Sequence, residues 1–207
     1  MDERRVTFPA GDLTLEGLLG VANSPSTRPG AVVCHPHPMY GGSMHNNVVE
    51  AILDSLWQRG FATLRFNFRG VGDSEGEYDG GEGEGDDAAA AITFLKSQAG
   101  VSAEGLVLAG YSFGAMVALR RGLEAAEVAR VIAVALPIGM ARLEPTTTSK
   151  PVLMVSGDSD SYSPVDGLKK LRERLGSESK VQIIAGADHF FGGYEAQLSR
   201  MIAAALG

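Results

Sequence analysis

The chain has few of the residues that stabilise or anchor special classes of protein. It contains one cysteine, Cys34, among 207 residues, so no disulfide can form within it. A single thiol is compatible with the reducing cytoplasm, where we expect the protein to be located. The N-terminal residues lack the apolar core of a signal peptide. No apolar run approaches the roughly 18 residues of a transmembrane helix, so no membrane span is expected.

Positive charge is also scarce. The 18 Lys and Arg residues are outnumbered by 25 Asp and Glu residues, which gives a net charge of −7. This balance disfavours nucleic acid and anionic membrane surfaces as partners, because both bind basic patches and no basic run is present. The hydrophobic content of 44% is that of a globular protein. The length suits one domain over residues 1–207. It does not determine the oligomeric state, and a homodimer is compatible with it.

What the sequence does have is an alternation of β-rich runs and helical patterns from residue 31 onward, with a hairpin expected before it. This alternation predicts a mainly parallel α/β sheet with an antiparallel N-terminal edge and helices on both faces. The expected strands are 4–8, 14–19, 31–34, 62–68, 106–109, 131–136, 152–156 and 181–184. The expected helices are 46–59, 86–98, 115–123, 165–175 and 194–206.

Two segments interrupt this alternation. Residues 70–87 are rich in Gly and acidic residues, and their oxygen spacing matches no recognised calcium loop. We therefore expect a solvated, mobile connection, with a calcium loop as the alternative. A dinucleotide-binding loop is not expected, because the third Gly of G-x-G-x-x-G is missing. Residues 137–151 are too few for a separate cap domain, so a site beneath them is expected to be open.

The most informative motif is Gly110-Tyr111-Ser112-Phe113-Gly114, which has G-x-S-x-G spacing. It directly follows an expected strand and precedes an expected helix, as a nucleophile elbow does. Such a tight turn forces Ser112 toward a positive φ, and Gly110 and Gly114 supply the room. The sequence therefore predicts Ser112 as a catalytic nucleophile. An ordinary glycine-rich turn is the alternative.

A serine hydroxyl needs a base, and the base needs an acid to orient it. Of the four histidines only His189 follows Ser112, and it comes after the last expected strand, at the sheet edge where the elbow lies. The acid is expected after the penultimate strand. There Asp160 is favoured over Asp158, because three residues past a glycine give the loop room to turn. Asp158 is expected to hydrogen-bond the backbone of its own turn. Asp188, next to the histidine, is a third option for the acid, but a structural role in its own loop is expected for it.

An oxyanion hole needs two N–H donors. One is expected to be the backbone N–H of Phe113, directly after the nucleophile, and the second an N–H of the loop after the first parallel strand. The prolines of that His-Pro-His-Pro loop have no N–H, so His37 between them is the expected second donor. A metal site at His35, His37 and His45 is the alternative. Other ligand residues are scattered, so neither a metal nor a cofactor is expected, and His35 is expected to be a hydrogen-bonded loop residue.

Several longer motifs resemble the small bacterial α/β-hydrolases related to dienelactone hydrolase, in a subgroup of predicted serine hydrolases. The resemblance implies the α/β-hydrolase fold without a separate cap. It also implies an acid three residues after a glycine and four before a proline, which Asp160 matches. Dienelactone hydrolase has cysteine where this chain has Ser112, so its substrate is not implied. Asn67 and Arg69 are expected to brace loops. The motifs are 35–38, 41–44, 65–76, the elbow and 187–191.

Together these features predict a cofactor-free serine hydrolase that cleaves small carboxylic esters or thioesters through an acyl-enzyme. One alternative is a peptidase-like or perhydrolase activity with the same triad. Another, from a different class, is a non-catalytic α/β-hydrolase scaffold that binds a small ligand or a protein. The sequence leaves the physiological substrate open.

Overall fold

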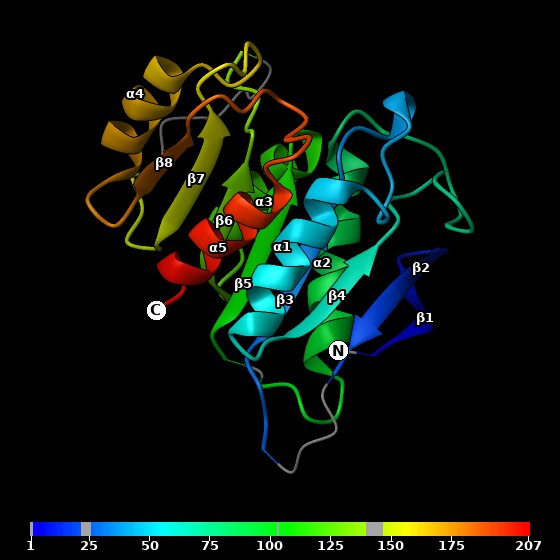
Figure 1. Ribbon diagram of the computed structural model, residues 1–207. Helices are drawn as coiled ribbons and strands as arrows, with labels where there is room; N and C mark the ends of the chain where they lie inside the picture. The colour runs from blue at the N-terminus through cyan, green and yellow to red at the C-terminus, as the bar shows by residue number, and fades with distance from the viewer. Residues whose placement is uncertain (1, 22–25, 103, 140–146) are drawn as a thin grey trace.

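The computed structural model describes residues 2–21, 26–102, 104–139 and 147–207. Its centre is an eight-stranded sheet in the order β1-β2-β4-β3-β5-β6-β7-β8 (Figure 1). β1 pairs antiparallel with β2, and β2 pairs antiparallel with β4, whereas all other neighbours are parallel. The predicted parallel sheet with an antiparallel N-terminal edge is therefore confirmed. The strands are β1 Glu3–Ala10, β2 Leu13–Gly20, β3 Gly30–Cys34, β4 Ala62–Phe66, β5 Leu106–Tyr111, β6 Val128–Val134, β7 Val152–Gly157 and β8 Lys180–Ile184.

Helices cover both faces of the sheet, as predicted (Figure 1). α1 and α5 pack on one face, and α2, α3 and α4 pack on the other. Successive residues of β3 alternate between the two cores: Val32 lies in the core under α2–α4 and Val33 in the core under α1 and α5. The helices are α1 Asn47–Gln58, α2 Glu82–Lys96, α3 Phe113–Glu124, α4 Val165–Leu175 and α5 Glu195–Ala205, with a short 3₁₀ helix, η1, at Pro38–Tyr40.

The Gly- and acid-rich segment 70–87 differs from its prediction. α2 begins at Glu82, four residues before the predicted start, and the carboxylate of Glu84 accepts hydrogen bonds from the N–H groups of Gly81 (2.7 Å) and Asp79 (3.0 Å). Both Glu84 and Asp87 are buried. The prediction of a solvated connection is therefore wrong for its last third, because these carboxylates cap and anchor a helix.

The parallel strands end at one edge of the sheet, and the residues predicted to be catalytic lie at this edge. β4 and β5 flank β3 on opposite sides, so the connections leave β3 and β5 in different directions. A cavity lies there, lined by residues that follow β3 and β5. The loops after β3, β5, β7 and β8 converge there. Part of the segment 137–151, predicted to form only a short roof, lies outside the described residues at 140–146.

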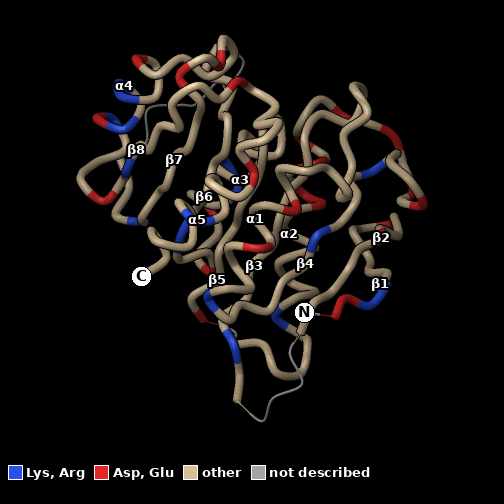
Figure 2. The backbone as a smooth tube through the Cα atoms, in the orientation of Figure 1, with Lys and Arg blue, Asp and Glu red and all other residues tan. Residues whose placement is uncertain are grey.

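Charged residues are dispersed over the molecule. Lys and Arg are scattered among Asp and Glu along the backbone (Figure 2). Within the described ranges, no helix is long and apolar enough to cross a membrane.

Candidate active site

Ser112 occupies a strained turn between β5 and α3. Its φ of 53° and ψ of −115° lie in a region that side chains other than glycine rarely adopt. The Ser112 N–H donates to the carbonyl of Val134 at 2.9 Å, which holds the turn. A Cβ on Gly110 would clash with the carbonyl oxygen of Gly114, and a Cβ on Gly114 with that of Cys34. The predicted positive φ is confirmed, and both glycines are sterically required.

His189, in the loop between β8 and α5, bridges Ser112 and Asp160. Its Nε2 lies 3.0 Å from the Ser112 Oγ, and its Nδ1 lies 2.8 Å from the Asp160 Oδ2. A carboxylate only accepts hydrogen bonds, so Nδ1 carries the proton and Nε2 accepts from the serine hydroxyl. The fold thus joins three side chains from three loops in one hydrogen-bonded chain.

The loop after β7 fixes the carboxylate of Asp160, whose side chain is fully buried. Its Oδ1 accepts from the backbone N–H groups of Tyr162 at 2.9 Å and Ser163 at 3.0 Å. These bonds satisfy the oxygen that does not face His189. The negative charge is therefore stabilised by the turn itself, and the other oxygen is directed at the imidazole.

The two other aspartates considered for this position have different partners. Asp158 is exposed, and its Oδ1 accepts from the N–H of Gly186 at 2.8 Å, which ties the loop after β7 to the loop after β8. The prediction that Asp158 binds the backbone of its own turn is therefore wrong. Asp188 accepts from the N–H of Phe190 at 2.9 Å, within its own loop.

The backbone N–H groups of Phe113 and His37 are the two expected oxyanion donors. Neither N–H donates a hydrogen bond to an acceptor within the described residues. Both residues line the same cavity as Ser112. The His37 carbonyl faces the other way, where it accepts from the N–H groups of Tyr40 and Gly42, both at 3.1 Å. The loop is thus folded around the carbonyl of His37 and leaves its N–H unused.

His35 braces the same loop from the interior. Its Nδ1 donates to the Pro36 carbonyl at 2.6 Å, and its Nε2 accepts from the N–H of Phe68 at 3.0 Å. Burial lowers the pKa of His35 from 6.5 to about 4, so the ring stays neutral. Both ring nitrogens are occupied, and His45 is exposed. Among the residues that the structure describes, no three His, Cys, Asp or Glu side chains group to hold a metal ion.

A cavity of about 540 Å³ opens over Ser112. His37 and Tyr40 line it from the loop after β3, and Phe113 and Met116 line it from α3. The loops after β7 and β8 contribute Tyr162, His189 and Phe190. The lining is mostly apolar, and the volume suits a small organic ligand.

Comparison with known proteins agrees with this architecture. Residues 31–198 match the family of the alpha/beta hydrolase domain. The chain belongs to the alpha/beta hydrolase family. An uncharacterized protein of Rickettsia prowazekii is 36% identical over an alignment of 198 residues, and the alignment covers 90% of this chain and 82% of that protein.

Solved structures extend the comparison. An alpha-beta serine hydrolase homologue from Coxiella burnetii is 33% identical, with a TM-score of 0.86 over 100% of this chain and 97% of that one. A serine hydrolase without lid from Xanthomonas campestris is 31% identical, with a TM-score of 0.85 over 100% and 94%. An esterase from Pyrococcus furiosus, 18% identical with a TM-score of 0.82 over 99% and 91%, shares the fold. Family membership and the two serine hydrolase structures that are more than 30% identical support a hydrolase activity.

Two side chains of the loop after β4 brace the site of this hydrolase, as expected for Asn67 and Arg69. The Asn67 Oδ1 accepts from the N–H of Met44 at 2.9 Å, and its Nδ2 donates to Glu16 at 2.6 Å. Arg69 forms an ion pair with the buried Asp87 at 2.7 Å. These contacts tie the loop after β3 to β2 and the end of β4 to α2.

Sequence reasoning missed Tyr111, the residue before the nucleophile. Its hydroxyl donates to the backbone carbonyl of His189 at 3.0 Å. Burial, with the nearby charge of Asp160, raises the pKa of Tyr111, so the hydroxyl stays protonated and able to donate. The alternation of side chains along β5 puts Tyr111 on the face covered by α1 and α5, and this signal could have placed it beside the loop of His189.

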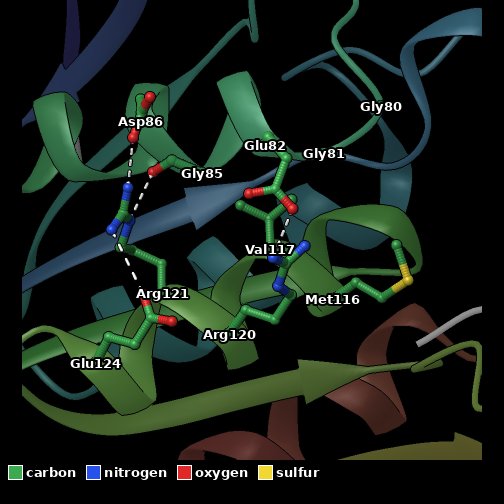
Figure 3. A pocket seen from close by; sticks show the side chains of 10 residues that line it. All are labelled: Gly80, Gly81, Glu82, Gly85, Asp86, Met116, Val117, Arg120, Arg121 and Glu124. Atoms are coloured by element: carbon green, nitrogen blue, oxygen red, sulfur yellow. Dashed lines mark hydrogen bonds and ion pairs between the residues drawn. The ribbon is translucent and has the colours of Figure 1, made fainter. Parts of the chain in front are cut away.

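A second cavity, of about 150 Å³, lies where α2 begins alongside α3 (Figure 3). Its charged side chains pair with one another: Arg120 with Glu82 at 2.7 Å, and Arg121 with Asp86 at 2.5 Å. Its described lining residues include no serine, cysteine or histidine. This cavity therefore lacks a pair of a serine or cysteine with a histidine, and Ser112 with His189 stays the candidate site for acyl transfer.

Proposed function

We propose that this alpha/beta hydrolase is a serine hydrolase that cleaves small carboxylic esters or thioesters through an acyl-enzyme. The observation that carries the proposal is the hydrogen-bonded chain from the Ser112 Oγ through His189 to Asp160, which faces a cavity of about 540 Å³. Nucleophile, base and orienting acid in this order are the parts that acyl transfer requires.

Each group has a defined part in the proposed reaction. The His189 Nε2 takes the hydroxyl proton as the Ser112 Oγ attacks the carbonyl carbon, and Asp160 stabilises the imidazolium that forms. Nε2 then gives this proton to the leaving oxygen or sulfur, whose bond to the acyl carbon breaks. Water attacks the acyl-Ser112 ester with His189 again as base, which releases the acid and restores the hydroxyl.

The oxyanion of the tetrahedral intermediate is assigned to the N–H groups of Phe113 and His37. Two observations support this assignment. Both N–H groups lack a protein acceptor within the described residues, and both residues line the cavity beside Ser112. Phe113 also begins α3, where the helix dipole favours negative charge.

Replacement of the nucleophile tests the proposal. Ser112→Ala is expected to lower kcat for p-nitrophenyl acetate by roughly 10⁴-fold or more, because the acyl-enzyme can no longer form. Turnover is measured from p-nitrophenol release. Circular dichroism and urea unfolding establish that the variant is folded. Ser161→Ala, which replaces an exposed serine in the loop after β7, is the matched control and should keep the activity.

Covalent labelling supplies a second readout. A fluorophosphonate should add its mass to the peptide that contains Ser112 in the wild type and leave Ser112→Ala unlabelled. Persistent ester turnover in folded Ser112→Ala would contradict the assignment of the nucleophile. Folded wild-type protein with neither turnover nor label would favour a non-catalytic binding scaffold.

A further inference from the structure

Large hydrophobic side chains that are exposed gather at one place. Among the described residues these side chains are Met39, Tyr40, Tyr162 and Phe190, with exposed fractions of 57–84%. Three of them line the cavity over Ser112, and Met39 adjoins Tyr40 in the chain. Exposed apolar side chains that cluster at a cavity mark a surface that binds a ligand or a partner.

Two of these side chains lie beside the proposed base. The ring centroid of Tyr162 is 4.8 Å from that of His189, and the centroid of Phe190 is 5.6 Å from it. Tyr40 belongs instead to the loop of the oxyanion donors, with its ring 4.7 Å from that of His37. We call Tyr40, Tyr162 and Phe190 the aromatic rim of the cavity. Two of its side chains lie beside the proposed base, and the third lies beside the loop of the oxyanion donors.

The proposed reaction mechanism determines which part of an ester lies beside the base and which part lies beside the oxyanion donors. In the proposed reaction the carbonyl oxygen faces the N–H groups of Phe113 and His37, and His189 gives its proton to the leaving oxygen. The alcohol part of the ester must then lie next to His189 when the bond breaks. Tyr162 and Phe190 are the aromatic side chains of the rim that it meets there.

The charge of the residues that line the cavity also limits the class of alcohol that can bind. The described lining residues include no Asp, Glu, Lys or Arg. Burial lowers the pKa of His37, so its imidazole is neutral near pH 7 and supplies no cation. A carboxylate on the substrate would lose water on binding and find no Lys or Arg partner among the described lining residues. The cavity thus favours an uncharged group.

We infer that the alcohol part of the substrate is an uncharged aromatic group that packs against Tyr162 and Phe190. This inference rests on the proposed function and names the substrate class for it. Aromatic pairs at such distances prefer offset or edge-to-face arrangements, which fits an aryl ring beside two exposed aromatic side chains.

Acetate esters of different alcohols test the inference, because all of them form the same acetyl-enzyme. Phenyl acetate is compared with the acetate of hexafluoroisopropanol, an alkyl alcohol about as acidic as phenol, and each rate is divided by the rate of alkaline hydrolysis. The corrected kcat/KM should favour the aryl ester at least about 10-fold. Phe190→Ala and Tyr162→Ala should each lower this ratio roughly 5- to 10-fold.

The ratio separates recognition of the alcohol from disturbance of the base. Displacement of His189 in a variant slows both esters alike and leaves the ratio unchanged, and the shared deacylation rate reports it independently. Met39→Ala is the matched control, because it removes an exposed side chain next to the rim that does not line the cavity. This variant should keep the wild-type ratio within about 2-fold.

A second pair of esters tests the charge. The carboxylate 3-acetoxybenzoate should have a kcat/KM at least about 10-fold below that of its methyl ester, again after correction for alkaline hydrolysis. A corrected aryl preference near 1, unchanged in the Phe190 and Tyr162 variants, would overturn the inference. The proposed function would still stand, since acetyl-Ser112 forms from both esters.

Two further results would also overturn the inference about the alcohol group, each for a different reason. If no ester acetylates Ser112, the proposed function fails and this inference fails with it. If Met39→Ala lowers the ratio as much as Phe190→Ala, and the wild type co-sediments with phosphatidylcholine vesicles, the rim is a lipid-binding surface and the assignment to the alcohol group is wrong.

Discussion

His35 shows how a single side chain can hold the site in one protonation state. Its Nε2 accepts the hydrogen bond from Phe68, which a protonated ring cannot do. The fold therefore requires neutral His35, and its pKa falls to about 4. Between pH 6.5 and pH 4 the unfolded chain binds a proton at this residue that the folded chain does not. The free energy of unfolding consequently decreases as the pH falls through this window.

The size of this effect is testable. A shift from 6.5 to about 4 corresponds to roughly 3 kcal/mol of stability lost between pH 6.5 and pH 4. His35→Gln keeps an acceptor for the Phe68 N–H but does not titrate, so its free energy of unfolding should decrease less over this range. Urea unfolding at pH 7, 5 and 4 measures the difference, with His45→Gln at an exposed histidine as control. Equal pH dependence in wild type and His35→Gln would contradict the account.

The roles that could be predicted best from the sequence are those that depend on residues close together in the chain. Gly110, Ser112 and Gly114 lie in one turn, so local sterics alone predict the positive φ. The backbone N–H that Asp158 binds, in contrast, belongs to Gly186, 28 residues away. This contact depends on the pairing of β7 with β8, which sequence spacing does not reveal.

At the scale of elements, the elbow depends on the close approach of α3 to β3. A Cβ on Gly114 would lie 2.5 Å from the carbonyl oxygen of His35, a backbone atom that cannot move aside alone. Gly85 in α2 is also near the start of a helix, but its nearest neighbour would be the Arg121 side chain, at 3.9 Å. The two glycines thus differ in packing more than in secondary structure.

Alanine at each position should separate these roles. Gly114→Ala is expected to lower the free energy of unfolding by about 2–3 kcal/mol or more, because α3 must move away from β3. Gly85→Ala should raise it by up to about 1 kcal/mol, because alanine favours a helix. Urea unfolding of both variants checks this. Two stable variants would show that the elbow tolerates a wider separation of α3 and β3.

The start of α2 shows why an element boundary could not be predicted. Gly81, Gly83 and Gly85 are typical of a loop, so the sequence places the start of the helix after them. In the structure a Cβ on Gly83 would clash with the guanidinium of Arg69, which pairs with the buried Asp87. This glycine gives room to an ion pair, a function that requires knowledge of the tertiary contact.

At the scale of the whole molecule, two ion pairs of similar length differ in burial. Arg65 pairs with Glu3 at 2.6 Å, with side chains 9% and 13% exposed, and it joins β4 to the N-terminal strand. Arg120 pairs with Glu82 at 2.7 Å, with side chains 45% and 76% exposed. Solvent screens the second pair, whereas loss of one partner leaves the first with a buried charge.

Glutamine at each glutamate tests this difference. Glu3→Gln is expected to lower the free energy of unfolding by about 1–3 kcal/mol, because Arg65 keeps its buried charge without full compensation. Glu82→Gln should lower it by about 1 kcal/mol or less. Urea unfolding at low salt measures both. Equal losses would mean that the distance within a pair, and not its burial, decides its contribution.

The layered architecture could be predicted because strands and helices have different hydrophobic periods. The runs 31–34 and 106–109 are apolar at every position, which requires cover on both faces of the sheet. The strand order could not be predicted. It depends on which distant strands pair, such as β3 with β5, and no local pattern contains that information.

The place of His189 after the last strand has a consequence for synthesis of the protein. Translation produces the elbow of Ser112 first, then Asp160, and the imidazole last. A chain that stalls on the ribosome before β8 can contain the turn and the serine but has no histidine after Ser112. In the proposed mechanism, the nascent polypeptide therefore stays inert toward esters until its final loop and α5 have been made.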